Sequence, residues 1–558
     1  MSSDQGGGIA LDPKRNNGSM PLSERPTASA NDTRPVNLDA IVRTGSRVSG
    51  VGSVNVSGSA DQAEQNASMA TMSSLRRNLI AAMIVFSNLV QMTIGFAGVG
   101  GGFQLGKILG VDISTSTWIA ASYGLTQGAF VLIAGPIGAV YGHKRLLIYG
   151  TLWLGACNLV CGFCNNFIAF VVMRALSGLG GAFIMPNAVA MITIANPPGP
   201  TRNIYLALFG SSAPVGGWLG ALLLGLFLDY AEYKWFFLTV FMICVVVAAV
   251  LSLLVPREVS VNRHGKIDWT GAALIVSVLI LFNFSWNQAP SSGWSNPAVI
   301  ACLIASVVLL GAFLIWEQYI ASHPIMPLTI FKAPSFGVLV LVVLVNFMAV
   351  GVFCWYQVLW MQEIWKWSLL HFALSWTPFV VCAIAATSLA AWLVPRLDAQ
   401  WILAIGTMSI LAACLLMATL SGPHIYWPQV FPSVIFFAFC PDLVYTAAQI
   451  IASGSVSRLH QGTAASLISV LNLYGNSLGL GFAGTIEVQT NKQGRDRILG
   501  FRAALYFAVA ISSLALLVDI LFIRCVKDKK RGWEESDMTS LADEELEARA
   551  TTSGMSRA

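Results

Sequence analysis

Two charged side chains, Arg174 and Asp442, lie deep inside long apolar stretches of this 558-residue chain. A charge in hydrocarbon costs several kcal/mol, so the few that are kept are candidates for function. Asp442 is predicted to bind a proton or a cation; the alternative is a structural partner that locks helices together. Arg174 stays charged, but it can pair with a carboxylate or hold an anionic substrate. Asp229, Glu317 and Asp519 lie within a turn or two of the stretch ends, where they can meet water.

Uncharged polar and aromatic side chains interrupt the same stretches and are candidates for the wall of a cavity. Asp442, Tyr445 and Gln449 follow the spacing i, i+3, i+7, which places them on one face of a helix. A polar face on an apolar helix predicts contact with a cavity, and hydrogen bonding between helices is the alternative. The candidate cavity residues are Asn88, Gln91, Asn187, Asn346, Trp355, Tyr356, Gln357, Trp376, Tyr445, Gln449, Asn472 and Asn476.

The elements that carry these residues are predicted to be membrane-spanning helices. Hydrophobic residues make up 56% of the chain and charged ones only 11%, whereas a soluble domain has roughly 25% charged residues. Apolar stretches long enough to cross ~30 Å of hydrocarbon recur about fourteen times, and such stretches must be helical because lipid offers the backbone no partner. The predicted spans are 79–99, 118–138, 146–164, 168–192, 204–228, 235–255, 268–286, 297–316, 336–358, 371–394, 401–420, 428–452, 463–486 and 503–523.

The two ends of the chain are polar, and we expect both to be cytoplasmic. Residues 1–75 are rich in Ser, Gly, Asn and Asp without apolar periodicity, which predicts a disordered tail, and residues 526–558 are similarly polar. Lys and Arg are in excess in the loops on the side of both ends, which indicates a multi-pass protein with that side inside the cell. This orientation leaves Asn283 as the one possible glycosylation site, at the outer end of a span.

Several classes of function find no support in the sequence. It contains no HExxH motif, no Walker glycine loop and no nucleophile elbow, so we expect neither an enzyme nor an ATP-driven pump. We also expect no metal site and no cofactor. The chain lacks a basic stripe interleaved with aromatic residues, so nucleic acid is not an expected partner. Small residues and Pro214 and Gly217 in the fifth span predict close packing and a helix bend.

Three motifs resemble those of the major facilitator superfamily. The loop after the second span runs from Gly135 through Gly142 to Lys144 and Arg145, and resembles the inner-gate signature of that family, with Ala139 where an Asp is usual. Phe170–Gly178, which contains Arg174, resembles the motif implicated in proton transfer. Ala213–Gly217 is similar to the Gly-Pro motif of antiporters. The fourteen predicted spans resemble the drug:proton antiporter family, whose first span often carries an Asp at the position that Gln91 occupies here. The stretch Phe439–Tyr445 resembles a fungal branch associated with drug resistance, metabolite export or low-affinity ammonium transport.

The resemblance implies a helical major facilitator fold with six, two and six spans. It divides the chain into an N-terminal bundle at 76–255, a linker with two extra helices at 256–334 and a C-terminal bundle at 335–525. It further implies a monomeric plasma-membrane transporter that exports a drug or secondary metabolite by alternating access, with protons coupled through Asp442 and Arg174. Uptake of a small solute such as ammonium is one alternative, and a non-transporting sensor or scaffold is another.

Overall fold

The computed structural model describes residues 73–196, 199–255, 265–333, 335–420, 425–456, 460–492 and 494–523. They all belong to the compact unit that runs from Ser57 to Ala558. The predicted N-terminal tail, apart from its last three residues, and the predicted C-terminal tail at 526–558 lie outside the described residues. The described part of the chain is helical and contains no strand.

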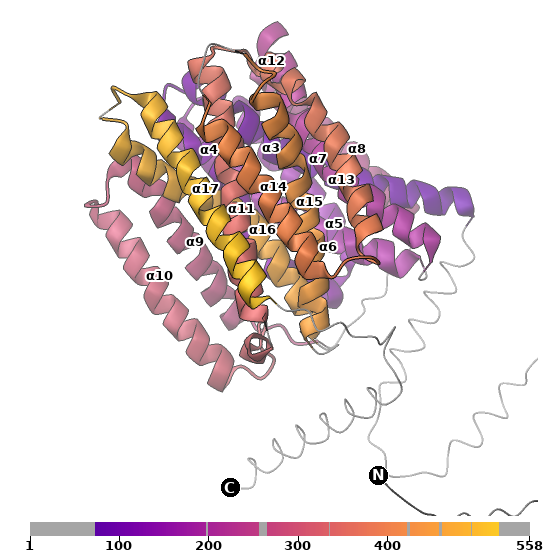
Figure 1. The fold of residues 1–558 in the computed structure, drawn as a ribbon. Coiled ribbons are helices and arrows are strands. Elements are labelled where there is room, and N and C mark those ends of the chain that lie inside the picture. The colour runs from indigo at the N-terminus through magenta and orange to yellow at the C-terminus, as the bar shows by residue number, and fades with distance from the viewer. Residues whose placement is uncertain are drawn as a thin grey trace, which may run out of the picture. The chain divides into compact units, whose positions relative to one another are not determined.

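The helices follow one another with short connections (Figure 1). Thirteen are long and apolar enough to cross a membrane. The remaining long helix, α16, has 30 residues and is more polar, so the prediction of about fourteen spans is confirmed at thirteen to fourteen. The helices are α3 (Ser74–Ile108), α4 (Ile113–Tyr141), α5 (His143–Phe163), α6 (Phe167–Ala195), α7 (Pro200–Tyr230), α8 (Tyr233–Leu254), α9 (Trp269–Ser292), α10 (Pro297–Ile315), α11 (Phe336–Leu359), α12 (Leu369–Ser375), α13 (Thr377–Leu393), α14 (Ala399–Ala418), α15 (Val430–Ser455), α16 (Gln461–Thr490) and α17 (Arg497–Phe522).

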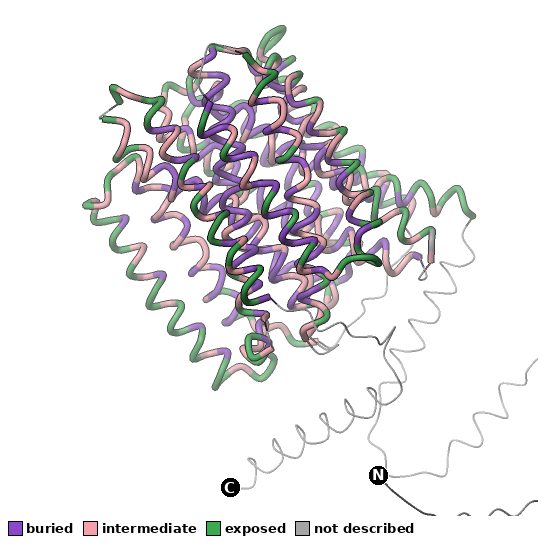
Figure 2. Tube along the Cα trace, in the orientation of Figure 1, coloured by how far each residue is buried: buried purple, intermediate pink, exposed green. Residues whose placement is uncertain are grey.

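Helices α3 to α8 pack mainly on one another, and so do α11 to α17; we call these two sets the first and second halves. The halves meet where α4 packs on α16 and where α7 packs on α12 and α13. Helix α9 packs on both α4 and α16, and α10 packs on α9. Most of α10 is exposed, as a helix that faces lipid would be (Figure 2).

The helices alternate in direction, so α3 begins and α17 ends at the same end of the bundle. We call it the termini end; there the Arg76 side chain donates to the carbonyl of Leu254 at 2.9 Å. The opposite end carries the end of α3 and the π-helical turn η4 (Trp360–Ile364), which continues α11. We call this opposite end the Glu363 end.

Two spans differ from their predicted ranges. The predicted span 371–394 is two helices, because α12 ends at Ser375 and α13 begins at Thr377 with Pro378 in its first turn. Proline cannot donate a backbone hydrogen bond, so the helix restarts at this point. Helix α16 runs to Thr490, four residues beyond the predicted end, and therefore includes Glu487.

Candidate functional site

A cavity lies between the two halves and is mainly apolar. It holds about 620 Å³ of space that no atom fills, part of which is open to solvent. Helices α3 and α4 of the first half and α11 and α16 of the second half line it. The lining residues are Met92, Gly95, Phe96, Val99, Ala120, Tyr123, Gly124, Gln127, Gly351, Cys354, Leu473, Asn476, Ser477 and Leu480. None of them carries a formal charge, so the lining suits an uncharged guest.

Polar groups reach the cavity from both halves. Gln127 is on α4, and its Nε2 atom donates to Oε1 of Gln91 at 3.4 Å. The hydroxyl of Tyr123 donates to the backbone carbonyl of Gln91, also at 3.4 Å. Asn476 faces them from α16 and donates to the Asn472 carbonyl at 2.7 Å. A guest would therefore find a few hydrogen-bonding groups among apolar walls, as is usual for small-molecule sites.

Of the predicted cavity residues, the structure brings Asn476 to the cavity wall and Gln91 directly behind it. Most of the others bond within or between helices: Asn88 to Ser212 at 2.8 Å, Asn346 to Thr407 at 3.1 Å, and Asn187 to His143 at 2.7 Å. Sequence reasoning missed Tyr123, Gln127, Cys354 and Ser477. The sequence did contain a signal for Gln127, because Gly124 and Gly128 lie on either side of it. Small residues let helices approach closely, so these glycines mark a helix contact that includes a polar side chain.

Two further predicted cavity residues, Gln357 and Trp376, carry buried polar groups without a hydrogen-bond partner among the described residues. Both side chains are buried, and within the part of the chain that the structure describes neither the Gln357 amide atoms nor the Trp376 Nε1 atom has such a partner. A buried polar atom without a partner costs about 1–3 kcal/mol. This cost is relieved if the protein passes into a state in which water or a guest reaches these atoms.

Arg174 is fully buried in α6 and holds three helices of the first half together. Its Nε atom donates to the Ile119 carbonyl of α4 at 2.9 Å, and its terminal nitrogens lie 3.4 Å from the carbonyls of Ile94 and Gly95 in α3. The Tyr123 ring centre lies 5.8 Å from the guanidinium carbon. In the described residues no carboxylate pairs with it. Pairing with a carboxylate, one of the two roles that the sequence allowed for Arg174, is therefore not present among the described residues in this state.

Asp442 lies in α15 of the second half, partly buried against α13. Its Oδ2 atom accepts a hydrogen bond from the Thr387 hydroxyl at 3.2 Å. Further along α15, the hydroxyls of Tyr445 and Ser469 lie 2.9 Å apart, and Gln449 donates to the Ala465 carbonyl at 3.1 Å. Tyr445 and Gln449 thus join α15 to α16, whereas the contacts between described residues give Asp442 one neutral partner and no cation. It can take up a proton without breaking an ion pair.

Glu487 is a second carboxylate inside a long helix, which the sequence reading placed just beyond a span. Its Oε2 atom accepts a hydrogen bond from the Tyr356 hydroxyl of α11 at 2.8 Å. The predicted span 463–486 stopped one residue before Glu487, which lies in the last turn of α16. The boundary error has a physical cause, because the last turn of α16 is polar and hydropathy does not mark its end.

The sequence model of the Major Facilitator Superfamily matches residues 80–479. The chain belongs to the major facilitator superfamily. Members of this superfamily are transporters, so the prediction that the protein is not an enzyme is confirmed.

Two relatives and one solved structure illustrate what this major facilitator protein is similar to. A low affinity ammonium transporter of Saccharomyces cerevisiae is 31% identical, over 78% of this chain and 87% of the relative. A multidrug transporter of Aspergillus fumigatus is 30% identical, over 79% of this chain and 77% of the relative. The nucleoside transporter NupG matches with a TM-score of 0.58 at 9% identity, over 80% of this chain and all of that one, and shows the fold alone.

The loop of the transporter that resembles the inner-gate signature lies at the termini end. Gly142 separates α4 from α5 with φ of 101°, a conformation that few residues other than glycine adopt. Lys144 donates to the carbonyls of Ser252 at 3.1 Å and Val255 at 2.5 Å, which ties the loop to the end of α8. Arg145 is exposed. In α7, Pro214 lies inside the helix and Gly217 packs on the Phe96 ring of α3.

Asn283 takes part in a polar junction of the transporter where α4, α9 and α16 meet. The Ser477 hydroxyl lies 3.0 Å from Asn283 Oδ1 and 3.1 Å from the Ala121 carbonyl, and Asn287 donates to the Ser477 carbonyl at 3.1 Å. Asn283 is fully buried, so its amide is not accessible to a glycosylating enzyme, which argues against the predicted modification. The first extra helix is instead bonded to a residue of the cavity wall.

Replacing Asn283 with Leu is expected to lower the apparent affinity of the transporter for its guest. The change removes one of two acceptors of the Ser477 hydroxyl, and a lost hydrogen bond of this kind costs about 1 kcal/mol, or roughly fivefold in KM. Transport kinetics measure the effect. Leucine in place of Ser306, which is buried in α10 away from the cavity, is the control, and equal effects of the two changes would contradict a role for the junction.

Proposed function

We propose that this transporter exports a small, uncharged and largely apolar organic compound in exchange for protons, by alternating access. The uncharged cavity shared by the two halves is the observation that carries the proposal. Asp442 would carry the proton, because it is a carboxylate within a helix of the second half and has no cation beside it. Arg174 would support the first half rather than transfer protons, because its donors point at backbone carbonyls.

Contacts at the Glu363 end support alternating access. The Gln362 amide of the second half donates to the Gly100 carbonyl of α3 at 2.8 Å, and the Trp218 indole of α7 donates to the Ala373 carbonyl of α12 at 2.9 Å. These bonds close the Glu363 end, and they must break for the cavity to open there. Rocking of one half against the other would break them while leaving each half intact.

The relatives support both export of an organic compound and uptake of ammonium, and the cavity favours the first. A site for a small cation is expected to offer a carboxylate or a cage of aromatic faces. The lining here has no carboxylate, and its two aromatic residues, Phe96 and Tyr123, stand among aliphatic side chains and glycines. An apolar organic guest fills such a space better than a hydrated ion does.

The excess of Lys and Arg on the side of the termini supports a cytoplasmic location for both ends. The Glu363 end would then face the cell exterior from a plasma membrane. Helices of a single chain line the cavity, so a monomer is sufficient for transport.

Replacing Gln127 and Asn476 with Leu is expected to weaken export of guests that form hydrogen bonds. Each change removes an amide from the cavity wall while keeping its approximate size, so KM rises about fivefold or more for such guests and little for apolar ones. Competition for export by a panel of neutral compounds measures this selectivity. The control is Asn158→Leu, because Asn158 is buried in α5 away from the cavity. The same loss in the control would exclude a specific role for the two amides.

Direct flux measurements test the proposed function itself. Proteoliposomes with a proton gradient are expected to move neutral organic compounds and not labelled methylammonium. Methylammonium flux alone would support the ammonium alternative. No flux of any candidate from a correctly folded protein would support a sensor or scaffold.

A further inference from the structure

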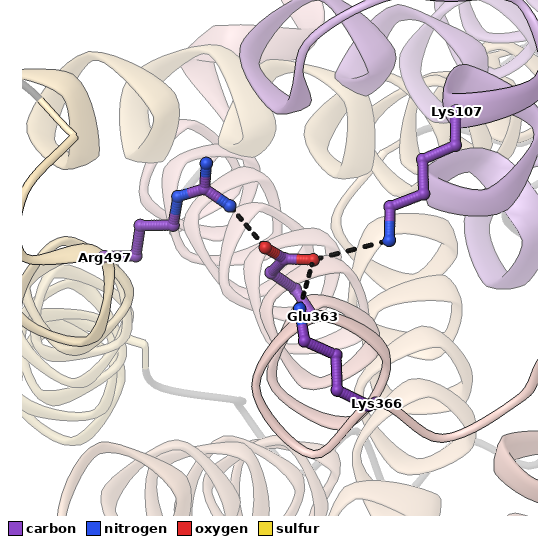
Figure 3. A network of polar contacts seen from close by, with 4 residues as sticks. All are labelled: Lys107, Glu363, Lys366 and Arg497. Carbon is purple, nitrogen blue, oxygen red and sulfur yellow. Dashed lines mark hydrogen bonds and ion pairs between the residues drawn. The ribbon is translucent and has the colours of Figure 1, made fainter.

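Four charged side chains gather at the Glu363 end of the transporter (Figure 3). Glu363 pairs with Lys107 at 3.5 Å, with Lys366 at 3.2 Å and with Arg497. The Glu363 side chain is 11% exposed, whereas those of its three partners are between 49 and 67% exposed. One partly buried carboxylate therefore holds three cations that solvent can reach, and the cluster carries an excess of positive charge.

Lys107 is the one member of the cluster that belongs to the first half. It lies in the last turn of α3, whereas Glu363 and Arg497 come from η4 and α17 of the second half. Among the ion pairs between described residues, Lys107–Glu363 is the pair that joins the two halves. It cannot persist when this end opens, so it acts as a latch.

Glu487 lies behind this latch within the second half. It accepts the hydrogen bond from Tyr356, which lies about two turns before Glu363 in the continuous helix formed by α11 and η4. Glycine at position 500 lets α17 approach, since a Cβ there would lie 3.0 Å from Cγ of Glu487. Tyr356 of α11 and Arg497 of α17 are the titratable or charged groups that face Glu487; within the described residues, α4, α9 and α15 contribute none. Arg497 contacts Glu363 and, three residues before Gly500, lies on the face of α17 that meets Glu487.

We infer that Glu487 is a proton-binding positioning residue whose charge controls the Lys107–Glu363 latch through Arg497. With Glu487 ionised, two carboxylates face three cations, and Arg497 pairs with Glu363. With Glu487 protonated, one carboxylate faces three cations, and the larger excess of positive charge repels Lys107. Protonation of Glu487 therefore favours opening of the Glu363 end.

The direction of this effect fits an exporter. A proton that arrives from the Glu363 end would favour the state in which the cavity opens toward that end, where cargo leaves and a proton enters. Only this last step rests on the proposed function. The control of the latch by Glu487 follows from the charges alone.

Hydrogen exchange of the full-length protein in lipid nanodiscs tests the inference. The segments 107–113 and 363–369 flank the latch, and their backbone exchange, corrected for intrinsic rates, reports opening. Glu487→Gln mimics the protonated acid and is expected to raise their exchange about two- to fivefold at pH 7.5, the range that a partly exposed ion pair supports. It should also remove the increase that acidification causes in the wild-type protein. Glu232→Gln is the matched control, because Glu232 is an exposed acid that pairs with Lys234 and lies outside the cluster.

A double substitution separates control of the latch from a general loosening. Lys107→Gln breaks the latch directly and is expected to raise exchange as well. Adding Glu487→Gln to it should then change nothing, because two residues that act through one interaction are not additive. Wild-type exchange in Glu487→Gln, or full additivity of the two changes, would overturn the inference. The readout needs no substrate, so its failure and a failure of export are distinguishable.

Discussion

Asp442→Asn is expected to abolish proton-driven transport while leaving the protein folded in the membrane. Asparagine has the same shape and can still accept the hydrogen bond that Thr387 donates at 3.2 Å, but it cannot bind and release a proton. Removal of a proton-transfer group lowers rates about 100-fold or more. Export into proteoliposomes under an imposed pH gradient, with thermal stability measured on the same sample, checks both parts of this expectation.

Two comparisons sharpen the test of Asp442. Exchange of labelled for unlabelled guest without a gradient should persist in Asp442→Asn, because that exchange needs the cavity and not the proton. Asp229→Asn, at an exposed position near the end of α7, should transport normally. If Asp442→Asn shows wild-type proton-driven flux, Asp442 is not the coupling carboxylate and Glu487 becomes the leading alternative.

Arg174→Leu is expected to destabilise the whole protein rather than alter its proton coupling. The guanidinium satisfies carbonyls of Ile94, Gly95 and Ile119, and its loss leaves these acceptors without their charged donor in a buried site. A hydrogen bond from a charged donor contributes about 1.5–3 kcal/mol. Thermal unfolding in detergent and the yield of monodisperse protein measure the loss.

The conservative change Arg174→Lys distinguishes the scaffold role of Arg174 from proton transfer. Lysine restores the charge but not the fork of donors, so partial recovery of stability with an unchanged pH profile of transport is expected. A stable protein whose pH optimum has moved would instead favour the role that the family motif implies. Arg145→Leu is the control, because Arg145 is exposed at the termini end.

Arg174 and Asp442 illustrate how far sequence reasoning reached into the site. Their isolation in apolar stretches singled them out correctly as unusual, because a charge in a membrane helix needs a partner or a purpose. The sequence could not distinguish a structural role from a functional one, because that distinction depends on which groups the neighbouring helices place around each charge. The structure surrounds Arg174 with carbonyls of the first half and leaves Asp442 with a single hydroxyl in the second.

The sequence by itself determined the helical membrane architecture, because apolar length and the lack of backbone partners in lipid depend on each stretch alone. It also limited the chemistry, since motifs for metals, nucleotides and nucleophiles are local. The tertiary structure alone decided which polar residues share a cavity, because Gln127 and Asn476 come from different halves and meet only through the packing of α4 on α16. It likewise brought Lys107 and Arg497 to Glu363, ion pairs between helices far apart in the chain that no periodicity records.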